Sequence, residues 1–406
     1  MDNKFLLSIL VPTRNRAEYA LSAAKQILSI ASDCIQVVIS DNSNDKRLEK
    51  MLTPYFGDKR LKYNYSPDTL SFVANFGIAV ALAEGEYICV IGDDDGVNPE
   101  IVEITKWASN NNVKAIKPEV QAVYFWPDAI SQSSKISLNN GCLIVSEISA
   151  RVRVVDTSVE LCKLLKNGCR GYLSLDLVKL YHGLVKKECM NEIQKLTGGY
   201  FGGLSPDIYS AVALSILIPR IVCIDYPITI PGICSNSGSA DAATGRHTGE
   251  LESAPHLIGH RDYVWAKQVP PFYCVETIWA ESAISAFRDM RATDLLAKFR
   301  LEALSVSCIE KYPQYKELII DHFTGNGTGI MRASKRMSLG LAKLSIPIMN
   351  IFERGLKRIG RVRRKTVRFC NIQNISEGQK ILSKHLLSSG FNIRQVIENV
   401  IDKLKI

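Results

Sequence analysis

Short apolar runs alternate with longer amphipathic stretches along the first hundred residues. A short apolar run bounded by turn residues is typical of a buried strand, and a 3.6-residue apolar period is typical of a helix. Alternation of the two predicts an α/β fold, a doubly wound, mostly parallel sheet. The predicted strands are 6–11, 35–40, 61–65 and 87–91, and the predicted helices are 15–30, 46–55 and 72–83.

Polar and charged residues follow these strands directly. Thr13 and Arg14 follow the first, Asp41 the second, and the Asp93–Asp95 triplet, inside Gly92–Gly96, the fourth. In open α/β sheets, ligands bind beyond the carboxyl ends of the strands. Three adjacent carboxylates repel one another, so a shared cation is one explanation of the triplet, and oxygen ligands suit Mg²⁺ or Mn²⁺. A solvated acidic turn is the alternative.

The ordered motifs of this region resemble glycosyltransferase family 2, which has the GT-A fold. The family's motifs are matched by Val11–Arg16, by Asp41–Ser43, by Asn75–Ile78, by Gly85–Ile88 and by Asp93–Pro99. The resemblance covers about the first hundred residues closely and extends more loosely to about residue 235. It implies an inverting sugar transferase that takes a nucleotide-diphosphate sugar, UDP-linked in many members.

The resemblance also implies roles for single residues. Asp41 would accept the imide N–H of uracil, as an acceptor-only carboxylate can, and an Asx turn is its structural alternative. Asp94 and Asp95 would bind the metal, with Asp93 facing the ribose, because Gly92 stands where many members carry the first Asp. The substrate-binding residues expected in all are Pro12, Thr13, Arg14, Asn15, Asp41, Asn75, Asp93 and Asp94.

Inverting transfer also needs a base for the acceptor hydroxyl. The glycine-rich stretch 198–203 is followed by Ser205, an expected N-cap, by Pro206 and by Asp207 at the start of an apolar helix. The resemblance implies a base at the start of a helix beyond the metal motif, so Asp207 is the expected catalytic base. The alternative is a first-turn aspartate that only complements the helix dipole.

A histidine completes the metal site in many proteins of this fold. His247 is the expected third ligand, while His256 and His260 have i, i+4 spacing but are flanked by Pro255 and Gly259. For each histidine, an ordinary hydrogen-bonded side chain is the alternative.

Composition agrees with a cytoplasmic enzyme. Of the 406 residues, 46% are hydrophobic, enough for a sizeable core. The eleven cysteines form no CxxC pair, which predicts reduced thiols without disulfides or zinc. The start of the chain does not resemble a signal peptide, and no apolar run approaches the roughly 20 residues of a membrane span.

The net charge of +9 is concentrated in one segment. Residues 332–368 hold twelve Lys and Arg and one acid, so they carry +11 and the remainder sums to −2. Apolar and basic residues fall on opposite faces of a helical projection, better formed after Pro347, which predicts a helix at an anionic membrane surface. Packing of that helix on its own domain is the alternative. Nucleic acid is disfavoured because interleaved aromatic residues are absent.

Together these features predict an inverting, metal-dependent glycosyltransferase at the inner face of a bacterial cytoplasmic membrane, acting on a lipid-linked or surface-polysaccharide acceptor. A non-catalytic nucleotide-sugar sensor or assembly scaffold is the second hypothesis, and a nucleotidyltransferase the third. The expected regions are a donor-binding half (1–120), an acceptor and catalytic half (121–235), an extension (236–330) and a basic helical tail (331–406).

Overall fold

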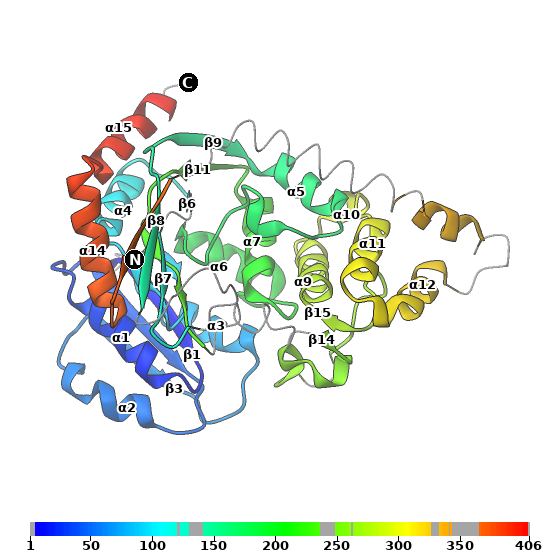
Figure 1. Cartoon of the computed structure of the whole chain (residues 1–406), viewed down its shortest axis with the longest axis horizontal. Helices are drawn as coiled ribbons and strands as arrows, with labels where there is room; N and C mark the ends of the chain where they lie inside the picture. The colour runs from blue at the N-terminus through cyan, green and yellow to red at the C-terminus, as the bar shows by residue number, and fades with distance from the viewer. Residues whose placement is uncertain are drawn as a thin grey trace.

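The computed structural model describes residues 5–119, 122–129, 141–235, 248–260, 263–325, 333–340, 342 and 365–404. Its centre is an eight-stranded sheet of order β3-β2-β1-β4-β10-β6-β11-β9 (Figure 1). These strands are β1 (Phe5–Thr13), β2 (Ile35–Asp41), β3 (Leu61–Tyr65), β4 (Gly85–Val90), β6 (Ala115–Pro118), β9 (Val152–Asp156), β10 (Leu184–Lys186) and β11 (Arg220–Ile224).

The predicted α/β sheet is confirmed, and its first four strands are all parallel. The β6–β11 pairing is also parallel, so four of the seven pairings are parallel. The other three are antiparallel because β10 is inserted between β4 and β6, and β9 lies on the edge beside β11. The parallel half aligns the carboxyl ends of β1, β2 and β4 along one rim.

Two helical layers cover the sheet (Figure 1). Alternate residues of β1 serve both layers: Leu7, Ile9 and Val11 are buried against one, and Leu10 against the other. The first layer holds α1 (Ala17–Leu28), α4 (Ile101–Asn110), α14 (Ile375–Ser388) and α15 (Ile393–Leu404). The second holds α3 (Phe72–Leu82), α6 (Lys187–Thr197) and α7 (Pro206–Leu217).

Further helices surround these layers. Helix α2 (Arg47–Leu52) packs on α1, and α5 (Thr157–Lys166) packs on α7. Beyond α7 lie α9 (Val275–Asp289), α10 (Thr293–Leu296), α11 (Leu301–Lys311) and α12 (Lys316–Thr324) (Figure 1). No helix in the described ranges is long and apolar enough to cross a membrane.

A second sheet has the order β13-β7-β8-β16. It joins β7 (Ala122–Phe125), β8 (Cys142–Ser146) and β13 (Gly232–Ile233) to β16 (Thr366–Cys370). The remaining two-residue strands pair as β5 (Gly96–Val97) with β12 (Thr229–Ile230), and β14 (Thr248–Gly249) with β15 (Tyr273–Cys274).

The C-terminal region differs from the expected helical tail. Thr366–Cys370 is the edge strand β16, antiparallel to β8, so the prediction of a helix through Arg368 is wrong. The following Ile375, Leu382 and Val396 belong to the same buried core as β1. Residues 333–340 are helical, and Leu339 packs near Val306, but 343–364, which hold most of the predicted basic helix, lie outside the described residues. The elements after residue 365 are therefore part of the main fold.

Candidate functional site

The rim formed by β1, β2 and β4 gathers the polar residues that follow those strands. The Thr13 hydroxyl, at the end of β1, donates to Asp93 Oδ2 at 2.6 Å. All three carboxylates of the triplet are buried. Parallel pairing of β1 with β4 brings the two strand ends together, as the sequence predicted.

Arg16 is the counter-charge of this acid cluster. Its guanidinium lies 2.7 Å from Asp93 Oδ1 and 3.0 Å from Asp94 Oδ2. Burial raises the pKa of both carboxyl groups, and the negative charges of the neighbouring aspartates raise it further. The positive charge of Arg16 opposes this rise. Apart from this ion pair with Arg16, neither of these two oxygens has a hydrogen-bond partner among the described atoms. The cluster therefore demands positive charge, and one arginine supplies only part of it.

Asp95 faces the protein's own donors. Its Oδ2 accepts from the Gly92 N–H at 2.5 Å and from the Tyr181 hydroxyl at 3.0 Å, and its Oδ1 accepts from the Gly232 N–H at 2.5 Å. His182 Nε2 lies 3.4 Å away, and burial lowers the pKa of His182 to about 4, so this ring is neutral at pH 7. Asp95 thus ties together the loop, the segment before β10 and β13.

Gly92 lies where the surrounding side chains leave little room for a Cβ atom. A Cβ atom here would lie 2.6 Å from the Tyr181 hydroxyl and 2.9 Å from Asp95 Oδ2, so no side chain fits without displacing this network. The space that an additional carboxylate would occupy is filled by Tyr181.

The donor set fits a hard divalent cation in part. Asp93 Oδ1 and Asp94 Oδ2 are buried carboxylate oxygens without hydrogen bonds, and Mg²⁺ is commonly bound by one or two carboxylates with phosphate and water completing the shell. Within the described ranges, no group of three His, Cys, Asp or Glu side chains is arranged as a metal site. The assignment of Asp95 as a ligand stays a prediction, as does that of His247, which lies outside the described residues.

The other two candidate histidines have aromatic neighbours. The His256 ring centroid lies 5.1 Å from that of Phe72 and 5.8 Å from that of Tyr273, and His260 lies 5.4 Å from Tyr263. These contacts match the alternative considered for them, that of ordinary packed histidines.

Asp41 is fully buried at the end of β2. Its Oδ1 accepts from the Ser43 N–H at 2.9 Å, which is the Asx turn considered as an alternative, and its Oδ2 accepts from the Tyr63 hydroxyl at 2.8 Å. A carboxylate has about four lone-pair sites, so capacity for a further donor remains. Its proposed contact with the base stays a prediction.

The remaining expected donor-site residues support the loop after β1. Asn75 accepts from the Ser40 hydroxyl at 2.7 Å and donates to the Thr13 carbonyl at 3.3 Å. Asn15 has φ +57° and exchanges hydrogen bonds with Ser43 and Asn44, both 2.8 Å long. Pro12 pairs with Ser40 inside the sheet, and Arg14 is half-buried beside it. These residues fix the shape of the rim.

Asp207 lies in the first turn of α7, as predicted. Ser205 takes the N-cap position, but its side chain makes no capping hydrogen bond. The Asp207 carboxylate is half-buried and makes no hydrogen bond to any described residue. Burial raises its pKa to about 6, Lys179 opposes the rise, and Asp95 adds to it. A carboxylate with a pKa near the working pH is suited to general-base chemistry.

Lys179 is the cation whose positive charge lowers the pKa of Asp207. Its Nζ donates to the Tyr172 carbonyl at 3.3 Å and lies 3.8 Å above the Tyr172 ring. Burial and the charge of Lys117 lower the pKa of Lys179 to about 7, and Asp207 opposes this. The two groups therefore titrate close to neutrality and are both charged between about pH 6 and 7.

Sequence reasoning left Arg16, Lys179, Tyr181 and His182 without roles. For Arg16 a signal existed, because it closes the Val11–Arg16 motif directly after the first strand. The other three lie between α5 and β10, on a segment whose place beside β4 depends on an antiparallel insertion. No local pattern indicates such an insertion.

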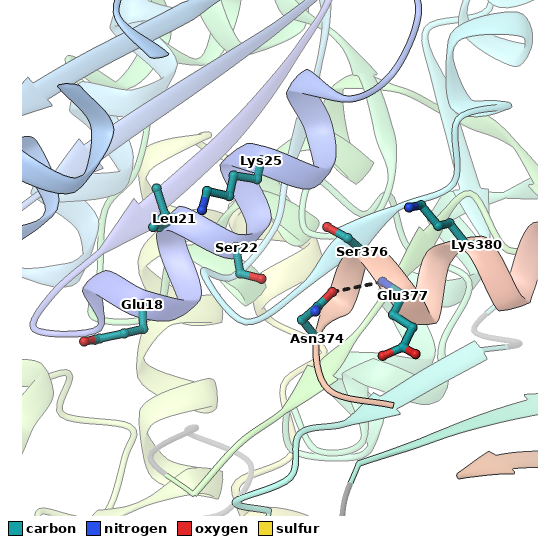
Figure 2. A pocket seen from close by; sticks show the side chains of 8 residues that line it. All are labelled: Glu18, Leu21, Ser22, Lys25, Asn374, Ser376, Glu377 and Lys380. Atoms are coloured by element: carbon teal, nitrogen blue, oxygen red, sulfur yellow. Dashed lines mark hydrogen bonds between the residues drawn. The ribbon is translucent and has the colours of Figure 1, made fainter. Parts of the chain in front are cut away.

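A separate pocket lies on the first helical layer (Figure 2). It has a volume of about 510 Å³ and runs between α1, with Glu18 and Lys25, and the start of α14, with Asn374 and Lys380. Asn374 caps α14 by accepting from the Glu377 N–H at 3.0 Å. None of the lining residues belongs to the acid cluster, so the candidate site is defined by the chemistry of the rim.

Comparison with known proteins gives one family model, one curated relative and two crystal structures of the same protein fragment. The family model of Glycosyl transferase family 2 matches residues 8–135. "Putative colanic acid biosynthesis glycosyl transferase WcaA" of Escherichia coli (strain K12) is 32% identical over 106 residues, which span 26% of this chain and 38% of that protein. The crystal structure of S. aureus TarS 1-349 in complex with UDP-GlcNAc is 12% identical, with a TM-score of 0.47 over 79% of this chain and 80% of TarS. The complex of the same fragment with UDP is 14% identical, with a TM-score of 0.43 over 91% and 98%.

Proposed function

We propose, because the family model of Glycosyl transferase family 2 matches residues 8–135, that this chain transfers a sugar, with inversion, from a nucleotide-diphosphate donor to a glycan or lipid-linked acceptor. The observation that carries the proposal is Asp207, a half-buried carboxylate in the first turn of α7 that makes no hydrogen bond to any described residue. Its pKa is about 6 and is raised in part by the charge of Asp95 in the acid cluster. The name of the WcaA relative refers to colanic acid biosynthesis, which supports the proposal of a surface-glycan acceptor.

The donor end of the reaction falls to Asp93, Asp94 and Arg16. Asp93 and Asp94 would hold Mg²⁺ or Mn²⁺, which neutralises the departing diphosphate when bound. Arg16 lies between the two acids and supplies a fixed positive charge on the same side. Thr13 holds Asp93 in place through its hydroxyl.

The acceptor end falls to Asp207. In an inverting displacement the acceptor oxygen forms a bond to the anomeric carbon while the bond from that carbon to the diphosphate oxygen breaks. Asp207 takes the acceptor hydroxyl proton as the new bond forms, and the bonding pair of the broken bond leaves with the diphosphate. Lys179 keeps Asp207 ionised by its charge, and Tyr172 holds Lys179.

Arg16 also favours a second candidate, a non-catalytic nucleotide-sugar sensor or scaffold. An arginine that already pairs with Asp93 and Asp94 neutralises part of the charge that a cation would need. The two functions are separated by incubating the full chain with a panel of nucleotide sugars and Mn²⁺, first for thermal stabilisation and then for release of the nucleoside diphosphate. A transferase releases it, by slow donor hydrolysis or faster with acceptor, whereas a scaffold is stabilised without release.

Turnover should fall as the pH drops through about 6, because protonated Asp207 cannot act as a base. Lys179→Met removes the cation that lowers the pKa of Asp207, so the acid limb of the pH profile should move to higher pH. The measurement is the rate of nucleoside diphosphate release between pH 4.5 and 8, which gives the midpoint of the acid limb for each variant. A shift of about one pH unit in that midpoint is the size to be resolved.

Lys179→Arg is the matched control, since it keeps a positive charge beside Asp207 and should leave the acid limb closer to that of the wild type. Superimposable acid limbs in the wild type and Lys179→Met would remove Lys179 from this role.

We also propose that the basic segment 332–368 holds the enzyme on an anionic membrane surface, as its charge of +11 suggests. The end of this segment overlaps β16, and α14 follows it, so truncating the chain before residue 332 would also remove elements of the main fold. Charge neutralisation in place is therefore the appropriate perturbation.

Changing Arg354, Lys357, Arg358 and Arg361 together to Gln should weaken binding to anionic vesicles by more than about 100-fold at low salt. Each basic side chain near such a surface contributes about 1 kcal/mol, and the attraction fades beyond a Debye length of about 10 Å at 0.1 M salt. Co-sedimentation with phosphatidylserine vesicles at two salt concentrations measures this.

The control neutralises four exposed lysines of the catalytic region, Lys106, Lys166, Lys195 and Lys267, and should change sedimentation much less. Equal loss in both variants, or binding to neutral vesicles that high salt leaves unchanged, would contradict the proposal.

A further inference from the structure

Two cysteines face each other across the strands β8 and β16. Cys142 Sγ and Cys370 Sγ are 3.4 Å apart, and the residues are direct partners in the antiparallel register. Cys142 is buried and Cys370 is exposed. Both are free thiols, separated by 228 positions in the sequence.

Their position in the ladder suits a covalent link. The Glu147 N–H donates to the Lys365 carbonyl at 2.8 Å, which identifies 147 and 365 as a hydrogen-bonded pair. Hydrogen-bonded and non-hydrogen-bonded pairs alternate in an antiparallel ladder, so the register makes 142 and 370 a non-hydrogen-bonded pair. Such pairs have Cα atoms about 4.5 Å apart, within the range of about 4.4–6.8 Å that disulfides span.

We propose that Cys142 and Cys370 are a redox modification site, which a disulfide oxidant of the glutathione class converts into a reversible intramolecular disulfide. The exposed Cys370 thiolate attacks oxidised glutathione, forms a mixed disulfide and releases one glutathione thiol. The Cys142 thiolate then attacks the Cys370 sulfur, and the second glutathione leaves. Two protein thiols are oxidised and two glutathione thiols are produced, so atoms and electrons balance.

The chemistry of the two thiols sets their order. Burial and the neighbouring Cys370 raise the pKa of Cys142 to about 11, so Cys142 is seldom a thiolate near neutral pH. The exposed Cys370 therefore reacts first. Attack by Cys142 is the slower step, and its rate increases with pH as more of the Cys142 thiol ionises. Arg368, on β16 with Cys370, has the opposite effect, because its positive charge lowers the pKa of Cys142.

The link would join β16 covalently to β8, and the residues that follow β16 contact Tyr124 on β7 and Gly96 beside the acid cluster. After β16, the Ile372 carbonyl accepts from the Tyr124 hydroxyl at 2.9 Å. Ile375, at the start of α14, packs so close to Gly96 that a Cβ there would lie 2.6 Å from its Cγ1. Gly96 directly follows Asp95, so oxidation would add a reversible covalent link to a support that is otherwise non-covalent.

The test exposes the full chain to mixtures of oxidised and reduced glutathione at pH 8. Remaining thiols are then blocked with N-ethylmaleimide, and the digested protein is mapped by mass spectrometry. The expected result is one linked peptide pair containing Cys142 and Cys370, lost again on treatment with dithiothreitol. Mapping is necessary because the chain has eleven cysteines.

Two variants decide the mechanism. Cys142→Ser should stop at the mixed disulfide and retain glutathione on Cys370, whereas Cys370→Ser should acquire no link at Cys142. Full alkylation of both cysteines in the wild type after oxidation, or glutathione retained on Cys370 of the wild type without ring closure, would overturn the proposal. The readout is a bond rather than turnover, so it is independent of the proposed transferase activity.

Discussion

Asp207→Asn should lower sugar transfer by about 100- to 10,000-fold while donor affinity stays near that of the wild type. The substitution keeps the size and polarity of the side chain but removes its ability to accept a proton. Because the base acts only as the acceptor bond forms, ground-state contacts with the donor are unaffected. Turnover is measured by release of nucleoside diphosphate with acceptor, and affinity by calorimetry or thermal stabilisation with the donor.

Asp294→Asn is the matched control. Asp294 also lies in the first turn of a helix, α10, but it is exposed. The control therefore removes a helix-dipole interaction without touching the rim, and it should leave turnover unchanged. Near-normal turnover in Asp207→Asn would return Asp207 to a helix-dipole role, worth only about 0.3–1 kcal/mol of stability.

Asp94→Ala and Asp95→Ala should have different consequences, although both lie in the acid triplet. Asp94→Ala removes one of the two carboxylates that pair with Arg16 and leaves Asp93 as its partner, so it should abolish metal-dependent donor binding with a smaller loss of stability than Asp95→Ala. Asp95→Ala leaves the Gly92 and Gly232 N–H groups and the Tyr181 hydroxyl without their acceptor. Each buried unsatisfied group costs about 1–3 kcal/mol, so this variant should also melt at a clearly lower temperature.

The measurement pairs thermal melting with donor titration at several Mn²⁺ concentrations. Asp58→Asn is the control, since it disrupts an Asp58–Arg60 ion pair of similar length, 2.7 Å. This pair precedes the edge strand β3 and so lies at the amino-terminal ends of the parallel strands, opposite the rim that holds the acid cluster. The substitution should leave donor binding intact. Unchanged Mn²⁺ dependence in Asp94→Ala would exclude Asp94 as a ligand, and an unchanged melting temperature in Asp95→Ala would exclude its tie to Gly232 and Tyr181.

Local periodicity was sufficient for the parallel half of the sheet and for the acids that follow its strands. The runs before Thr13, Asp41 and Asp93 are short and mostly apolar, with Ser8 inside the first and Gln36 inside the second, as expected for strands buried on both faces. The position of Asp207 in the first turn of α7 was also predictable, because Pro206 and the glycine-rich stretch mark the start of that helix. In each case the informative residues are neighbours in the sequence.

What sequence reasoning missed depends on pairings between distant segments. Strand β10 has three residues, and its antiparallel place between β4 and β6 brings Tyr181 and Lys179 toward the site. Strand β16 lies within a stretch whose basic and apolar residues fit a helical projection, yet its partner β8 selects the extended form. Secondary-structure propensity is a weak determinant when tertiary pairing competes with it.

The position of β16 also bears on how the chain is made. The core cluster that contains Leu7 also contains Val400, and β8 has no partner on its outer edge until residue 370 has been synthesised. At about 5–20 residues per second, the ribosome needs on the order of tens of seconds to pass from β8 to β16. During that interval β8 is an open strand edge, the kind of surface that pairs with other nascent chains. Chaperone binding to the partly synthesised chain is therefore expected to begin near β8 and to end when β16 docks.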